Sequence, residues 1–123
     1  MFVGKVVKVR SLKAYATAHS HVSIGDVLEE TPQYLVLLCK TYHFGTHVGG
    51  GGRIATLRQG EYVCGVLESE KSVRAIPWSQ IEVINELPTK TNWDVKAYID
   101  RSGTCCLANE QKTVITRPPA RDT

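Results

Sequence analysis

Short runs of apolar residues recur along the whole chain, and this pattern constrains the fold more than any other feature. No stretch of helical length places apolar residues at positions i, i+3, i+4 and i+7, as a helix packed on a core requires. Alternating or short continuous apolar runs are rich in β-branched residues and are separated by Gly, Pro, Ser and Asp. The sequence therefore predicts an all-β protein of short antiparallel strands, without crossover helices.

The turn signals divide the chain into expected strands. A polar tip, Ser69 to Lys71, predicts a hairpin, and Ser23 with Gly25-Asp26 predicts a turn. Trp78 to Gln80 predicts one helical turn or a tight bend. The expected strands are 2–10, 14–22, 24–30, 34–44, 61–68, 72–77, 81–87, 93–100, 104–108 and 112–116. We expect them to form a small closed or partly open barrel with an extra C-terminal hairpin.

Composition predicts one domain in a reducing compartment. The 123 residues fit a single domain at 1–116, followed by a polar, proline-rich tail at 117–123 that we expect to be frayed. The four cysteines form no Cys-x-x-Cys pair, and no apolar run has the length of a membrane helix. These features favour a cytoplasmic protein without a membrane association. Its net charge of +3 permits a nucleic-acid partner without requiring one.

Half of the chain carries a resemblance to known small barrels. The segments Gly25-Asp26-Val27-Leu28, Tyr34 to Leu38 and Ala75 to Ile84 resemble, in this order, the Sm-like and SH3-like barrels. The last segment also resembles the closing strand, bend and strand of the PRC-barrel family. Resemblance to Sm-like proteins implies ring-shaped oligomers that bind RNA. However, the Asp-x-x-Met-Asn and Arg-Gly motifs of that family are absent, so only the fold is carried over.

Four histidines form the first candidate site. His19 and His21 share one face of a strand, and His43 or His47 on a neighbouring strand could supply a third ligand for Zn²⁺. Surface histidines with ordinary hydrogen bonds are the alternative, and we expect no stoichiometric zinc and no cofactor. An enzyme or metal protein built on these histidines is the second functional hypothesis.

A glycine run forms the second candidate site. Gly49 to Gly52 precede Arg53, and the backbone N–H groups of Gly50, Gly51 and Gly52 could approach an anion held by Arg53 and Arg58. Tyr15, Tyr42 and Phe44 lie near Arg10, Lys13, Lys40 and Arg53 in the sequence, a mixture that is typical of sites that stack bases and neutralise phosphates. The run lacks the Lys-Ser/Thr ending of a Walker loop, and a disordered hairpin tip is the alternative.

The strand from Tyr34 to Cys39 predicts self-association. Its apolar residues are consecutive, so both faces of the strand must be covered, either by another layer of the chain or by a second copy. We expect a homo-oligomer whose interface includes Leu35 and Leu37 or the opposite register, Val36 and Leu38. The first functional hypothesis is thus a non-enzymatic barrel that self-assembles as a scaffold or interaction module and binds an anionic or nucleic-acid ligand.

Overall fold

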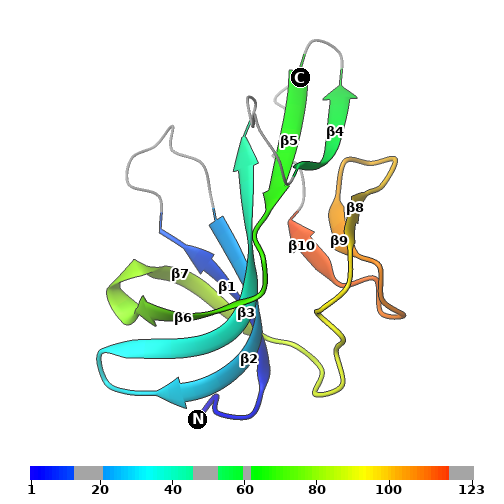
Figure 1. The fold of residues 1–123 in the computed structure, drawn as a ribbon. Helices are drawn as coiled ribbons and strands as arrows, with labels where there is room; N and C mark the ends of the chain where they lie inside the picture. The colour runs from blue at the N-terminus through cyan, green and yellow to red at the C-terminus, as the bar shows by residue number, and fades with distance from the viewer. Residues whose placement is uncertain (13–20, 46–52, 60–61, 117–123) are drawn as a thin grey trace.

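The computed structural model describes residues 1–12, 21–45, 53–59 and 62–116, with the backbone alone between 45 and 67. It confirms the all-β class. A seven-stranded antiparallel sheet has the order β4-β5-β3-β2-β1-β7 with β6 also paired to β3, and a second sheet has the order β10-β9-β8 (Figure 1). The pairings among the described strands do not close the larger sheet on itself. The expected strand 14–22 and the tail 117–123 lie largely or wholly outside the described residues.

The long strand β3 (Tyr34–Gly45) organises the larger sheet. Its first half pairs with β6 (Ser72–Pro77), and its last residues pair with β5 (Tyr62–Glu68), which in turn pairs with β4 (Arg53–Gln59). The predicted hairpin between β5 and β6 is therefore wrong. Ser69 exchanges hydrogen bonds with the Thr41 backbone, with its N–H donating to the Thr41 carbonyl at 2.9 Å and its hydroxyl accepting from the Thr41 N–H at 2.8 Å. The polar segment thus continues along β3 instead of turning back.

Strand β2 (His21–Glu30) passes through the predicted turn at Ser23 and Gly25 without a break. It pairs with β3 on one side and with β1 (Val6–Ser11) on the other. Buried Ser23 shares a hydrogen bond of 2.9 Å with the Thr41 hydroxyl, which satisfies both polar groups inside the sheet. Ser23 thus forms a buried polar pair with Thr41, and Gly25 allows the backbones of β2 and β3 to approach closely.

A short 3-10 helix, η1 (Trp78–Gln80), follows β6 and leads into β7 (Ile81–Glu86), as the sequence predicted. The Trp78 indole N–H donates to the Thr31 carbonyl at 2.8 Å, which fixes this bend against the β2–β3 turn. Strand β7 then pairs with β1 and forms one edge of the sheet.

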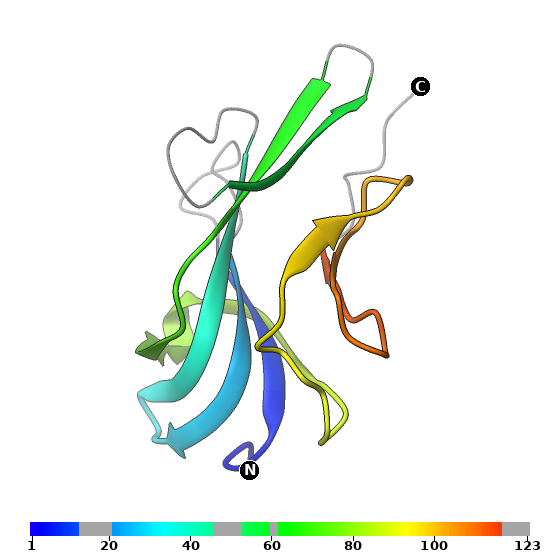
Figure 2. The same cartoon turned by 45° about the vertical axis from the view of Figure 1, so that its right-hand side comes forward.

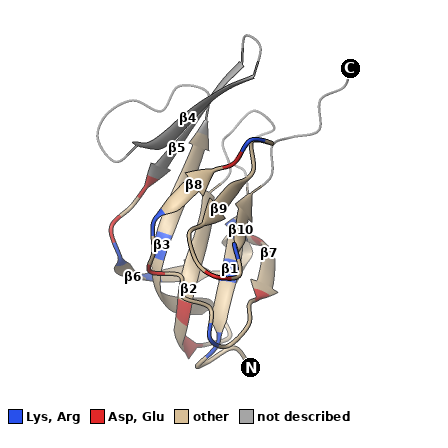
Figure 3. Cartoon of the chain, turned by 90° about the vertical axis from the view of Figure 1, so that its right-hand side faces the viewer, with Lys and Arg blue, Asp and Glu red and all other residues tan. Residues whose placement is uncertain are grey.

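The C-terminal hairpin expected from the sequence is part of a three-stranded sheet. Its strands are β8 (Ala97–Ile99), β9 (Cys105–Leu107) and β10 (Val114–Thr116). The turn between β8 and β9 is held by the Asp100 carboxylate, which accepts the Ser102 and Thr104 N–H groups at 2.9 and 3.0 Å. Figures 2 and 3 show this sheet standing against β1, β2 and β3.

Strands β1, β2 and β3 therefore carry buried side chains on both faces of the larger sheet. The inner face carries one cluster of buried side chains, which are Val7, Val9, Val27, Leu35, Leu37, Cys39 and Ile76. The opposite, covered face packs on the second sheet, in a cluster of Val6, Val22, Ile24, Tyr42, Trp93, Ala97, Cys105, Leu107 and Ile115. Burial on two faces explains why the apolar residues of β3 are consecutive. None of the helical residues that the structure describes forms a segment able to span a membrane.

Candidate anion-binding groove

Two cations project from the covered face of β1. Valines 7 and 9 point inward and are fully buried, so the intervening Lys8 and Arg10 lie on the opposite face by the two-residue period of a strand. Arg10 pairs in register with Val22 of β2 and Val83 of β7, and Lys8 pairs with Ile24 and Asn85. Both cations are half-buried. The strand thus holds two positive charges on one face, where their nearest cross-strand neighbours are Val22, Ile24, Val83 and Asn85.

A groove of about 230 Å³ opens where the second sheet ends. Its polar lining comes from Lys8, Arg10 and Asn85, and its apolar lining from Val22, Val83 and Ile115. The Lys8 ammonium donates to the Val114 carbonyl of β10 at 3.0 Å, which holds this cation at the junction of the two sheets. The groove is therefore built by three separate strands of one sheet and one strand of the other.

Arg10 has no acidic partner among the ion pairs of the described residues. None of the residues that line the groove is acidic. The neighbouring residues 13–20, which lie outside the described chain, contain no Asp or Glu in the sequence. A half-buried guanidinium with apolar walls favours an anionic group, because the low local dielectric strengthens charge-assisted hydrogen bonds.

The histidine site is present in part. His21 and His43 pair directly across β2 and β3, with their ring centroids 4.2 Å apart in an edge-to-face arrangement. Burial lowers the pKa of His43, and the nearby Arg74 guanidinium lowers it further. His19 and His47 lie outside the described residues. Among the described side chains, no three His, Cys, Asp or Glu residues cluster as metal ligands.

The glycine-loop site lies largely outside the described residues. Gly50, Gly51 and Gly52 lie outside the described residues, and Arg53 and Arg58 are located only as backbone positions of β4. Tyr42, the aromatic residue expected beside them, is fully buried between the two sheets. Its ring has no exposed face on which a base or another ligand could stack, so the structure removes Tyr42 from this site.

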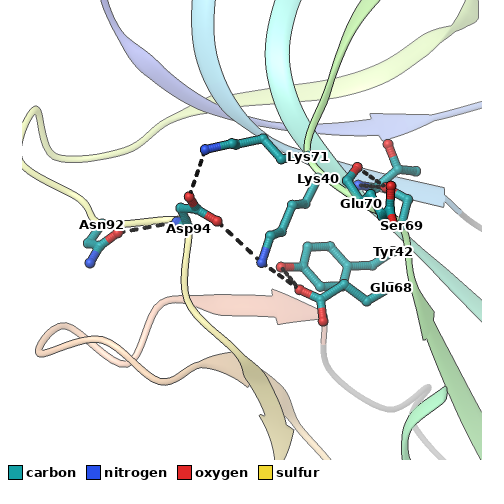
Figure 4. A network of polar contacts seen from close by, with 9 residues as sticks. Lys40, Tyr42, Glu68, Ser69, Glu70, Lys71, Asn92 and Asp94 are labelled. Atoms are coloured by element: carbon teal, nitrogen blue, oxygen red, sulfur yellow. Dashed lines mark hydrogen bonds and ion pairs between the residues drawn. The ribbon is translucent and has the colours of Figure 1, made fainter. Parts of the chain in front are cut away.

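A polar network beside Tyr42 joins the two sheets (Figure 4). The Lys40 ammonium lies 3.0 Å from a Glu68 carboxylate oxygen and 3.4 Å from one of Asp94, and Lys71 also reaches Asp94 at 3.0 Å. Burial alone would lower the pKa of Lys40, but the two carboxylates outweigh it and raise that pKa. The network connects β3 to the segment that precedes β8, and every one of these charges is balanced.

The residues of the expected oligomer interface divide into two registers. Leu35 and Leu37 are fully buried in the inner core of the chain itself and are not available to a partner. Leu38 is half-buried and packs against the cluster between the sheets, and Val36 is half-buried. The C-terminal sheet thus supplies part of the cover for β3, which the sequence pattern left to either another layer of the chain or a second copy.

Models of known families, curated proteins and solved structures provide no match to this chain.

The sequence interpretation named Arg10 only among the cations near Tyr42 and did not select Lys8, although a signal for both exists. In the segment Val6-Val7-Lys8-Val9-Arg10, the cations occupy alternate positions of a β-branched strand, and so they must share a face. The sequence does not indicate that β10 ends beside these two cations. Val114 of β10, which contacts Lys8, is 106 positions further along the chain.

Proposed function

We propose that this chain is a non-enzymatic binding module that holds an anionic ligand in the groove between its two sheets. The observation that carries the proposal is the half-buried Arg10, which has no acidic partner among the described residues and lies beside Lys8 in a groove with apolar walls. The groove residues include no Ser, Thr, Cys, His, Asp or Glu, so binding is favoured over catalysis.

The fold proposed for this module is an SH3-like or Sm-like small barrel. Strand β6 pairs with β3 and β7 pairs with β1, and the short η1 joins β6 to β7. The outermost strands of the path β6-β3-β2-β1-β7 are therefore β6 and β7, and these two strands are consecutive in the sequence, with only η1 between them. The fully buried inner cluster supports a curled sheet around a single core. The same proposal includes a cytoplasmic location. It also includes self-assembly through the partly exposed side chain of Val36 on β3.

Calorimetric titration with inorganic pyrophosphate at low salt tests anion binding. Replacing Arg10 by Gln removes a charge-assisted contact of about 1.5–3 kcal/mol, so affinity should fall by about 10- to 100-fold. Lys90→Gln removes the same charge from an exposed loop outside the groove and serves as the control. Affinity should also fall as NaCl rises. Equal binding by wild type and Arg10→Gln would place the anion elsewhere.

Metal binding is the second candidate, favoured by the contact between His21 and His43. The nearby Arg74 guanidinium opposes a cation at this position, since like charges repel. Elemental analysis of the purified protein separates the two candidates: one equivalent of zinc per chain, lost in a His21→Ala variant, would support the metal site.

A further inference from the structure

The groove reaches the edge of the larger sheet at β7. Strand β7 is the last strand on its side of the seven-stranded sheet, and among the described residues it pairs only with β1. In Figure 3, β7 lies beside the region that the second sheet covers. No other described strand pairs with the outward backbone N–H and C=O groups of β7, and an edge of this kind is a template for another extended chain.

The side chains of β7 that line the groove have the same spacing as the two cations of β1. Val83 and Asn85 on β7 line the groove and lie opposite Arg10 and Lys8. Successive side chains on one face of a strand are about 7 Å apart, because each residue rises about 3.3 Å. A peptide paired with the outer edge of β7 would place every second side chain on the groove face with that same repeat.

We infer that the ligand of the groove is an extended acidic peptide segment, which adds as a strand to the outer edge of β7 and directs alternate carboxylates toward Arg10 and Lys8. This inference rests on the proposed function, because it uses the same two cations. The added strand would lie about 10 Å from β1, two strand spacings away. Val83 lies between Arg10 and the position of the added strand, and its side chain is short. The long Arg10 side chain and a glutamate of the peptide can therefore meet over Val83.

Two other extended partners fit the groove less well. A single-stranded nucleic acid binds through aromatic platforms as well as cations, and none of the groove residues is aromatic. A second copy paired through its own β7 would present Val83 and Asn85 on this face, which supply no carboxylate. An acidic peptide supplies both the charge and the backbone hydrogen bonds.

Fluorescence polarisation with labelled octapeptides tests the inference. One peptide alternates Glu and Thr, and a second has the same composition with its four glutamates consecutive. We expect the alternating peptide to bind wild-type protein at least about 10-fold more tightly, and Arg10→Gln to remove most of that difference. Lys90→Gln again controls for net charge.

N-methylation of the alternating peptide isolates the backbone contribution. In an antiparallel pair, only alternate residues of the peptide direct their N–H groups at β7. One derivative is methylated at every Thr and the other at every Glu; one should lose binding and the other should retain it. Loss or retention by both would contradict strand addition.

Parallel titrations separate the two proposals. Pyrophosphate binding that depends on Arg10, combined with no preference between the two octapeptides, would overturn strand addition and leave the anion groove intact. Failure of pyrophosphate and of both peptides would overturn the proposed function as well. An oligothymidylate that binds more tightly than the alternating peptide, with the same dependence on Arg10, would assign the groove to nucleic acid.

Discussion

Gly25 of β2 lies so close to Cys39 of β3 that a Cβ atom on Gly25 would stand 2.6 Å from the Cys39 Cα and 2.7 Å from its Cβ. It would also collide with the Leu38 carbonyl oxygen. Backbone atoms cannot move aside as a flexible side chain can. Gly25→Ala should therefore destabilise the fold by about 3 kcal/mol, at the upper end of overpacking costs, as measured by urea unfolding.

Gly4 provides the comparison for this substitution. Its φ of +81° is strained for alanine, but a Cβ there meets no atom within 4 Å. Gly4→Ala should cost about 1 kcal/mol, from the backbone conformation alone. If the two alanine variants lost equal stability, close strand approach would not be the reason for glycine at position 25.

The network around Lys40 predicts unequal effects for two lysines that share Asp94. Lys40 exposes 16% of its side chain and also pairs with Glu68, whereas Lys71 exposes 49%. Lys40→Ala leaves the Glu68 carboxylate half-buried without its cation, and should cost about 2 kcal/mol. Lys71→Ala should cost less than about 0.5 kcal/mol. Thermal unfolding of both variants measures the difference, and a larger loss for Lys71→Ala would contradict this account.

The histidine pair predicts a loss of stability in mild acid. The pKa of His43 is lowered in the folded state, first by burial and then by Arg74, so the unfolded chain binds a proton more readily. This contribution to stability is complete above the unfolded pKa of about 6.5 and is lost as the pH falls toward the folded pKa. Urea unfolding at pH 7.5 and 5.5 should show the decrease.

A His43→Gln variant should show a smaller decrease over the same interval, because glutamine does not titrate. Carboxylates whose pKa values are lowered, such as Asp94 and Asp100, lose their contribution only at lower pH. An unchanged decrease in His43→Gln would assign the acid sensitivity to other groups.

Lys112 has a φ of 50°, in the left-handed region, at the end of the turn between β9 and β10. Its N–H donates to the Asn109 carbonyl at 3.1 Å, so the turn depends on this conformation. Asparagine tolerates the left-handed region better than lysine, and a β-branched residue tolerates it poorly. Lys112→Asn should raise the melting temperature slightly, and Lys112→Val should lower stability by about 1 kcal/mol. The opposite order would show that the turn changes conformation on substitution.

The sequence predicted the elements of this fold better than their partners. Strands 34–44, 72–77 and 81–87 and the turn at Trp78 were found nearly at their expected bounds, since local alternation and turn residues determine them. The hairpin at Ser69 was wrong because β3 is long enough to pair with both β5 and β6, a property of its partner and not of the polar segment. The turn at Ser23 was wrong because Thr41, eighteen positions away, satisfies its hydroxyl.

The candidate site was harder to predict for the same reason. The sequence pattern suggested His43 or His47 of a neighbouring strand as a third ligand beside His19 and His21. The contact between His21 and His43 follows from the pairing of β2 with β3. The groove instead requires Ile115 of β10 to lie beside Arg10 of β1, and no local pattern encodes that packing. Strand alternation indicates which side chains share a face, but not where the cover of that face ends.

The position of the second sheet has a consequence for synthesis. Strands β8 to β10 follow every strand that they cover, so a ribosome releases Val22, Ile24 and Leu38 before the residues that shield them. Until β10 emerges, the nascent chain exposes an apolar sheet face to its surroundings. Such intermediates aggregate readily and are typical clients of chaperones that act during translation. A chain truncated before residue 93 would leave this apolar face permanently exposed to solvent.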